Sequence, residues 1–278
     1  MKRITLMSKL LLITFLTGFV MSCSEDEASV TPQNQAAPPT LPPASSFAAY
    51  EAVKLPARED MENGRTVEFD NSGHAYLNYL GWHEGLKLHL ALPAVAFRAA
   101  FDSEAQYLPE EDRWVWAYNS TIFGNEYSIK LYGKKVDTNG VWEMRVSKKG
   151  GYQNVVWIEG VSALDGSGGR WATYTEGDDP RKAFNIEWKA ASKEGEIPSV
   201  KYTNLDTKSK LEGTYIEYGS LTDSDFTVYY HIFHAEEDRM LKIEFNSKTS
   251  QGRVSDAAHF GDQAWHCWNS DFENTVCK

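Results

Sequence analysis

Cysteine is scarce in this sequence, with three in 278 residues, and only Cys267 and Cys277 follow residue 23. A small scaffold held together by many disulfides is therefore excluded. In an oxidising compartment, two cysteines ten residues apart most simply form a disulfide, and we predict one here. Zinc binding by this pair with His266 is the alternative, but the sequence has no second Cys-x-x-Cys or His-x-x-x-His element to complete a tetrahedral site.

Basic residues are also in deficit, because 28 Lys and Arg stand against 39 Asp and Glu, a formal net charge of -11. Nucleic acids and anionic lipid head groups are bound by basic surfaces. This balance therefore argues against both as partners of the folded part of the chain.

Sequence motifs of catalysis are missing as well. No Gly-x-Ser-x-Gly elbow occurs, and no cysteine is free to act as a nucleophile if Cys267 and Cys277 are bridged. The glycine-rich stretch 165–169 lacks the Lys-Ser/Thr of a nucleotide-binding loop, so we interpret it as a hairpin turn. We expect no cofactor and no catalytic residues, and keep a hydrolase of extracellular polymers, which requires paired carboxylates, as an alternative.

Long apolar runs are limited to one segment near the N-terminus. Residues 10–21 are mostly apolar and follow Lys2, Arg3 and Lys9. This run is shorter than the roughly 20 residues that a spanning helix needs. It therefore has the organisation of a signal peptide, which we place at residues 1–22. Removal of the three basic residues would change the formal charge to -14.

The sequence Val20-Met21-Ser22-Cys23 ends this segment. It resembles the lipobox of bacterial lipoproteins, in which the cysteine is acylated and becomes the mature N-terminus. The acidic run at residues 24–27 is similar to the export tag of surface lipoproteins of Bacteroidota-type bacteria. The resemblance implies an exported protein held at the outer membrane by lipid on Cys23, facing outward or, alternatively, the periplasm.

Residues 23–58 contain six prolines among small and acidic residues, with few large apolar side chains. Such composition buries too little surface to offset the entropy of ordering, so we predict a disordered tether. Residues 59–278 then form a single β-rich domain.

Strand signals recur throughout this domain as short runs rich in Trp, Tyr, Val, Ile and Thr, separated by turn-forming residues. The ten predicted strands are residues 113–119, 126–132, 141–147, 154–159, 170–175, 183–189, 200–204, 213–218, 225–234 and 240–245. Short connections favour sequential antiparallel pairing, so the predicted fold is an all-β meander. A sheet of this size tends to curl, so we expect a barrel or half-barrel, with a β-sandwich as the alternative.

One helix is predicted at residues 90–105, with Pro93 in its first turn and apolar residues at spacings of three and four. Because it is apolar on most of its circumference, we expect it to be buried against the sheet. A curved sheet covered by one helix resembles the architecture of lipocalin-like and lipoprotein-carrier half-barrels. The sequence contains no motif of either family.

Aromatic side chains are the clearest candidates for ligand binding. Six tryptophans lie on successive predicted strands: Trp114, Trp116, Trp142, Trp157, Trp171 and Trp188. They either fill the core or line a cavity for a lipid, a sugar or an apolar ligand. Metal binding is not predicted, because His231 and His234 point to opposite faces of a strand. The acidic stretches 70–73 and 223–225 lack the length of a calcium loop, so at most they bind calcium weakly.

The sequence therefore favours a non-catalytic lipoprotein that binds or carries a small apolar or amphipathic ligand. The alternative is a surface interaction module that binds a protein or a glycan. An enclosed cavity lined by the tryptophans would favour the carrier, and a filled interior would favour the interaction module.

Overall fold

The computed structural model describes residues 37–48, 54–57, 70–192, 196–222 and 225–277. The signal segment, the lipobox and residues 223–224 lie outside this range. From Ala37 onward the described chain forms one compact unit. Fourteen strands make one sheet in which every strand pairs with its neighbours in sequence, and all pairs are antiparallel.

The strands are β1 (Ala105–Leu108), β2 (Arg113–Ile122), β3 (Asn125–Val136), β4 (Asn139–Lys148), β5 (Val155–Ala163), β6 (Gly168–Tyr174), β7 (Lys182–Lys189), β8 (Ser199–Asn204), β9 (Tyr215–Ser220), β10 (Val228–His234), β11 (Arg239–Phe245), β12 (Gly252–Ser255), β13 (His266–Trp268) and β14 (Asn274–Thr275). The helical elements are α1 (Ser45–Ala48), α3 (Asn71–Ala99), the 3-10 helix η2 (Ala100–Asp102) and α4 (Ala257–Phe260).

The predicted all-β meander is confirmed, and each of the ten predicted strands corresponds to one of β2 to β11. The sheet has four more strands than expected, because β1, β12, β13 and β14 have two to four residues each. Segments this short show no readable periodicity. The sheet also stays open and uncurled, where we expected a barrel or half-barrel.

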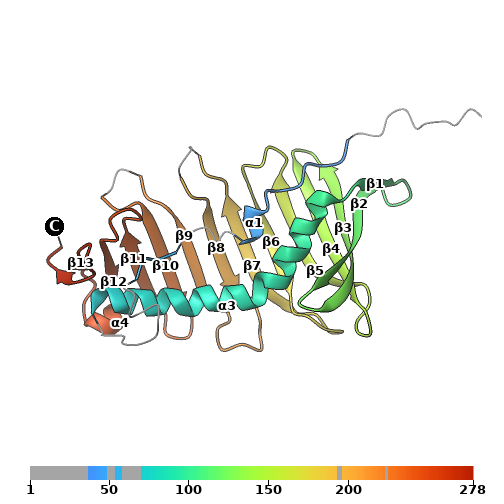
Figure 1. The fold of residues 1–278 in the computed structure, drawn as a ribbon. Helices are drawn as coiled ribbons and strands as arrows, with labels where there is room; N and C mark the ends of the chain where they lie inside the picture. The colour runs from blue at the N-terminus through green and yellow to red at the C-terminus, as the bar shows by residue number, and fades with distance from the viewer. Residues whose placement is uncertain (1–36, 49–53, 58–69, 193–195, 223–224, 278) are drawn as a thin grey trace, which may run out of the picture. The chain divides into compact units, whose positions relative to one another are not determined.

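Helix α3 explains why the sheet needs no closure. Its 29 residues correspond to about 43 Å of helix, or about nine inter-strand spacings of 4.8 Å. Figure 1 shows α3 crossing the strands on one face of the sheet. We call this the covered face and the opposite one the open face. Because the helix buries the apolar residues of the covered face, curling of the sheet on itself is not required.

Helix α3 begins 19 residues before the predicted start. Asp70 is its N-cap, and the Oδ1 atom of Asp70 accepts hydrogen bonds from the Gly73 backbone N–H at 2.7 Å and from the Ser72 hydroxyl at 2.9 Å. Pro93 lies inside the helix, where it supplies no N–H to the preceding turn, and Figure 1 shows the helix bending in its C-terminal half. Among the described helices, none is long and apolar enough to cross a membrane.

The core lies between α3 and the covered face. The predicted alternation in β4 is confirmed, since Trp142, Met144 and Val146 are at most 2% exposed. Tryptophan and glycine alternate along one row that crosses β2 to β6. The directly paired residues of this row are Trp114, Gly133, Trp142, Gly160 and Trp171. Each glycine leaves space on its strand for the indole ring of a neighbour.

Part of the predicted tether belongs to the folded unit. Phe47 is fully buried, with its ring centroid 5.3 Å from that of Phe97 and 5.0 Å from that of Trp171. The indole N–H of Trp171 donates to the Ser46 hydroxyl at 3.2 Å. The tether prediction for residues 23–58 is thus wrong for residues 37–48. The buried side chain of Phe47 provides apolar contact with the core, although the composition of this segment is proline-rich. Residues 23–36 lie outside the described range.

Candidate interaction face

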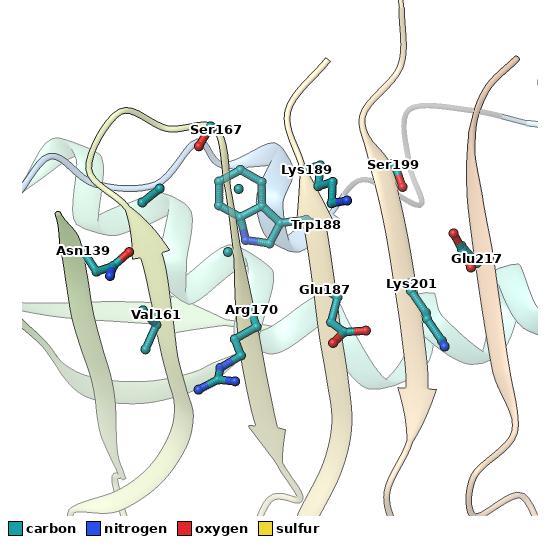
Figure 2. A pocket seen from close by; sticks show the side chains of 13 residues that line it. Asn139, Val161, Ser167, Arg170, Glu187, Trp188, Lys189, Ser199, Lys201 and Glu217 are labelled. Atoms are coloured by element: carbon teal, nitrogen blue, oxygen red, sulfur yellow. The ribbon is translucent and has the colours of Figure 1, made fainter. Parts of the chain in front are cut away.

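The open face carries a row of charged and titratable residues that directly oppose one another on neighbouring strands. Its members, from β6 to β11, are Arg170, Glu187, Lys201, Glu217, His231 and Lys242. The sign of the charge alternates over the first four positions. We call this row the charge ladder. Figure 2 shows the first four side chains on successive strands, with α3 behind the sheet.

The members of the charge ladder differ in whether their side chains have a partner within the chain. The side chains of Arg170 and Glu187 are exposed, and among the described residues neither side chain forms a hydrogen bond or an ion pair. The ammonium group of Lys201 lies 3.8 Å from the ring centroid of Tyr215. The side chain of Glu217 accepts a hydrogen bond from the Tyr229 hydroxyl at 3.3 Å. The ladder thus presents unpaired charges of both signs to the solvent.

A shallow depression of about 780 Å³ runs along the first four residues of the charge ladder, from β6 to β9. Asn139, Ser167 and Lys189 line it together with the first four ladder residues. Figure 2 shows these polar side chains arranged around the turn that connects β5 and β6. The glycine-rich stretch 165–169 is therefore the predicted hairpin turn, and it forms one border of this depression.

A second depression, of about 630 Å³, contains two carboxylates from adjacent strands. Glu143 directly opposes Glu159 in the β4–β5 pair. Arg145 donates two hydrogen bonds to the Glu143 carboxylate, at 2.8 and 3.1 Å, and these bonds hold the pKa of Glu143 below its usual range. Glu159 accepts a hydrogen bond of 2.6 Å from Tyr174. Burial and this hydrogen bond raise the pKa of Tyr174 to about 12, so its hydroxyl remains protonated.

This pair is the arrangement that the hydrolase alternative requires, and its chemistry does not favour catalysis. A glycosidase needs one carboxyl group with a raised pKa that serves as an acid. The hydrogen bonds from Arg145 instead keep Glu143 ionised, and the Glu159 carboxylate already accepts a hydrogen bond from the Tyr174 hydroxyl. The two carboxylates therefore form part of a stabilising network on the sheet surface.

Some aromatic rings on this side of the sheet are covered by cations. The guanidinium carbon of Arg113 lies 3.6 Å from the ring centroid of Tyr132, and that of Arg253 lies 4.4 Å from the ring of Trp265. With Lys201 over Tyr215, three rings are shielded in this way. A sugar ring that stacked on any of them would first have to displace the cation. These three rings are therefore not free to stack on a ligand.

The six candidate tryptophans occupy a different place. Five of them are at most 4% exposed and belong to the core cluster; these are Trp116, Trp142, Trp157, Trp171 and Trp188. Trp114 is partly buried and packs against the same cluster. The structure brings these rings together as packing of the sheet and α3, which corresponds to the filled interior rather than to a ligand cavity.

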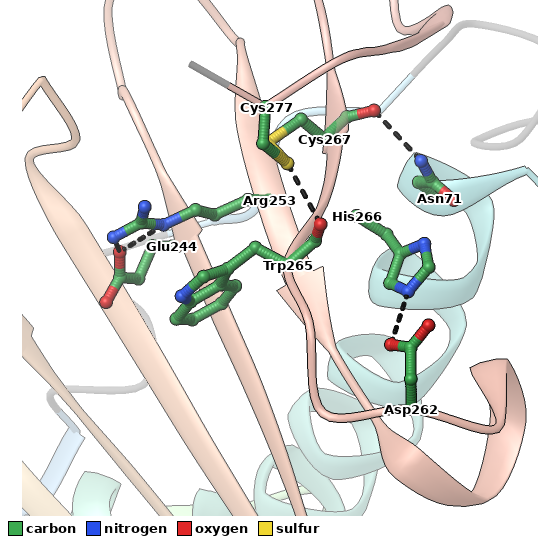
Figure 3. The surroundings of a disulfide bond; sticks show 8 residues. All are labelled: Asn71, Glu244, Arg253, Asp262, Trp265, His266, Cys267 and Cys277. Atoms are coloured by element: carbon green, nitrogen blue, oxygen red, sulfur yellow. Dashed lines mark hydrogen bonds and ion pairs between the residues drawn. A yellow bond between two sulfur atoms is a disulfide. The ribbon is translucent and has the colours of Figure 1, made fainter.

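Cys267 and Cys277 form the predicted disulfide. Figure 3 shows the bridge beside the start of α3, where the Asn71 side-chain amide donates to the carbonyl oxygen of Cys267 at 2.9 Å. The backbone N–H of Asn71 also donates to the side chain of Asn274 at 2.9 Å. The C-terminal segment is thus fastened to the helix and closes the β14 end of the sheet.

A buried charge cluster next to this segment was not apparent from the sequence. The Asp256 carboxylate is fully buried, caps α4, and lies 2.9 Å from Nε2 of His74 and 3.7 Å from Nε of Arg239. The rings of His74 and His259 stack with a centroid distance of 3.7 Å. Burial lowers the pKa of His74, with the hydrogen bond to Asp256 opposing this effect. His74 and Asp256 are 182 positions apart in the sequence, so no local sequence motif indicates that they meet.

The regions that we considered for weak calcium binding also have other roles where they are described. Asp70 caps α3, as stated above, and residues 223–224 lie outside the described range. His231 is part of the charge ladder, and burial lowers the pKa of its imidazole. His234 follows it at the end of β10, where burial and then the charge of Arg239 lower the pKa.

Comparisons with family models, with curated proteins and with solved structures find no match to this chain.

Proposed function

We propose that this chain is an exported lipoprotein, anchored through lipid on Cys23, whose open face binds a partner protein. The lipobox, the acidic residues that follow it and the disulfide support export and anchoring. We place the anchor in the outer membrane with the domain facing outward. A periplasmic orientation is the alternative.

One observation carries the binding proposal: the charge ladder presents both signs of charge in register on a face with no internal partner for Arg170 or Glu187 among the described residues. Protein surfaces carry interspersed charges of both signs, and complementary patterns give specificity and rapid association. A polyanion would be repelled by the glutamates of the ladder. Lys201 covers the Tyr215 ring beside the ladder, so this ring is not free to stack on an apolar ligand.

The filled interior is the reason to prefer this interaction module over the carrier that the composition first suggested. A carrier needs an apolar cavity that encloses most of the ligand. Here the five buried tryptophans pack against α3 and the segment around Phe47. The depressions of the open face are broad, shallow and lined by charged residues.

Site-specific photocrosslinking in the native cell envelope tests the binding face. A photoreactive residue in place of Glu187, on the ladder, is compared with one in place of Leu88, which is 78% exposed on α3. We expect a protease-sensitive adduct only from position 187, with a yield that falls at high ionic strength. Equal adducts from both positions, or an adduct that resists protease and is removed by glycosidases, would contradict a protein partner at this face.

Mass spectrometry of the N-terminal peptide tests the anchor separately. We expect Cys23 to be the first residue and to carry acyl chains. The Cys23→Ala variant should lose both the modification and its membrane association. A mature chain that begins elsewhere, with an unmodified cysteine, would contradict the anchor without affecting the binding proposal.

A further inference from the structure

Strand β2 leaves part of one sheet edge unpaired. Only residues 113–116 of β2 pair with β1, whereas residues 117–122 pair with β3 alone. In an antiparallel edge strand, every second residue directs its N–H and C=O away from the sheet. Among the described residues, none of these outward backbone groups of residues 117–122 receives a hydrogen bond partner. Six residues of extended strand present an edge of about 20 Å.

This edge lacks the features that normally protect one. Its sequence, Ala117-Tyr118-Asn119-Ser120-Thr121-Ile122, contains no charge and no proline, and the β2–β3 register has no bulge. Lysine, proline, bulges and very short strands are the usual means of preventing edge-to-edge pairing. The opposite edge of the sheet is protected, because β14 has two residues and the Cys267–Cys277 disulfide lies beside it. The two edges therefore differ in how far they are open to pairing.

The turn after this strand contains an unusual residue. Phe123 is 72% exposed and has φ of 48°, in a two-residue turn with Gly124, whose φ is 77°. Asparagine, aspartate and glycine are favoured at such positions, whereas a bulky side chain is strained there. An exposed, strained phenylalanine beside an unprotected edge marks a contact surface.

We propose that the open edge of β2 pairs with the same edge of a second copy of this chain. Antiparallel pairing of two identical strands is two-fold symmetric, so this edge is complementary to itself. Two copies of residues 23–278, each with a formal charge of -14, repel each other, and an uncharged strand is a place where they approach closely.

A two-fold axis perpendicular to the sheet at Ser120 defines the register. It pairs Asn119 with Thr121 of the second copy, and Ala117 with Phe123 of the second copy. Such an axis keeps the two open faces on the same side, so the dimer presents a continuous double sheet. The exposed Phe123 ring then gains an apolar neighbour in each copy.

Sedimentation velocity of residues 23–278 with Cys23→Ser, over a wide concentration range, measures the association. We expect a reversible dimer. Proline is then placed at residue 119 and, separately, at residue 120. Since N–H groups alternate in direction, one variant loses only an outward N–H, remains as stable as the parent and becomes monomeric. The other loses a β2–β3 bond and is destabilised.

The Phe123→Asn variant separates dimerisation from folding. Asparagine adopts positive φ more easily than phenylalanine, so the variant folds at least as stably as the parent, while the dimer dissociation constant rises at least tenfold. Leu211→Asn is the matched control, because Leu211 is 54% exposed far from this edge along the sheet order, and it should leave the dimer unchanged. A parent that stays monomeric at the highest concentration, or a dimer that resists both Phe123→Asn and the stable proline variant, overturns the proposal.

Discussion

The indole ring of Trp171 lies over Gly160, its direct partner on the neighbouring strand, in the space that a side chain at residue 160 would occupy. The same relationship joins Trp142 with Gly133 and Trp188 with Gly169. The covered face is thus filled by large rings that alternate with bare backbone. This pattern, rather than a cavity, accounts for the high tryptophan content of the chain.

Gly160→Ala should destabilise the domain. A Cβ atom at residue 160 would overlap the ring of Trp171 and lie 2.6 Å from the Arg170 carbonyl oxygen, so the sheet must shift locally. We expect a loss of about 1–3 kcal/mol in the free energy of unfolding, measured by urea denaturation. Gly81→Ala is the control: Gly81 lies in α3, a methyl group added there would meet no atom within 4 Å, and alanine should stabilise the helix by about 1 kcal/mol.

Phe47→Ala tests whether the segment before α3 belongs to the domain. Phe47 is fully buried between Phe97 and Trp171, so its truncation should cost about 3–5 kcal/mol of unfolding free energy. Truncation of the exposed Leu211 to alanine should change stability by less than about 0.5 kcal/mol. If Phe47→Ala were as harmless as Leu211→Ala, residues 37–48 would not contribute to the fold.

Removal of the disulfide should loosen one end of the sheet. The bridge closes a loop with a sequence separation of 10, for which loop entropy predicts about 3 kcal/mol of stabilisation. In the Cys267→Ala, Cys277→Ala double variant, amide hydrogen exchange should accelerate first in β13, β14 and the start of α3. Crosslinking from position 187 should be unchanged, because the charge ladder lies on other strands. A loss of crosslinking would instead indicate that the C-terminal segment acts at the binding face.

Stability should fall as the pH decreases below about 6.5 because of His74. Its ordinary pKa is 6.5, and burial lowers the pKa in the folded state. The unfolded chain therefore takes up a proton first as the pH falls, which favours unfolding by at most about 1.4 kcal/mol per pH unit for one group. This contribution is fully present above pH 6.5 and is lost as the pH decreases.

Urea denaturation of the His74→Gln variant across this pH range checks the assignment. The variant should show a shallower pH dependence than the parent, and His89→Gln, at an exposed position of the same helix, should retain the parent slope. His231 and His234 shift in the same direction, so a residual dependence is expected. An unchanged slope in His74→Gln would contradict a role for this histidine.

The regular part of the fold was predictable because its signals are local. Each of the ten predicted strands is long enough to show alternation, and the turns between them contain Gly, Asp or Asn. The start of α3 was missed for the opposite reason. Gly73, Gly81 and Gly85 lower the helix propensity of residues 71–89, and packing of this segment against the sheet overrides that preference.

The candidate site was not predictable, because it depends on register. Arg170, Glu187 and Lys201 are ordinary charged residues in their own strands, and only the pairing of β6, β7 and β8 places them in one row. The tryptophans were conspicuous in sequence, yet their burial depends on which face α3 covers. The Asp256 cluster joins segments that are distant in sequence, so it also could not be predicted from local patterns.

The length of α3 has a consequence for how this architecture can change. One helical turn advances about 5.4 Å, whereas one strand adds about 4.8 Å to the width of the sheet. Because hydrogen bonds at Asn71 tie the helix start to β13 and β14, and the Tyr118 hydroxyl ties β2 to the Ala96 carbonyl near its end, α3 acts as a ruler for strand number. A relative that gained one hairpin would need about six more helical residues, and a duplication without them would leave apolar residues of the new strands in water.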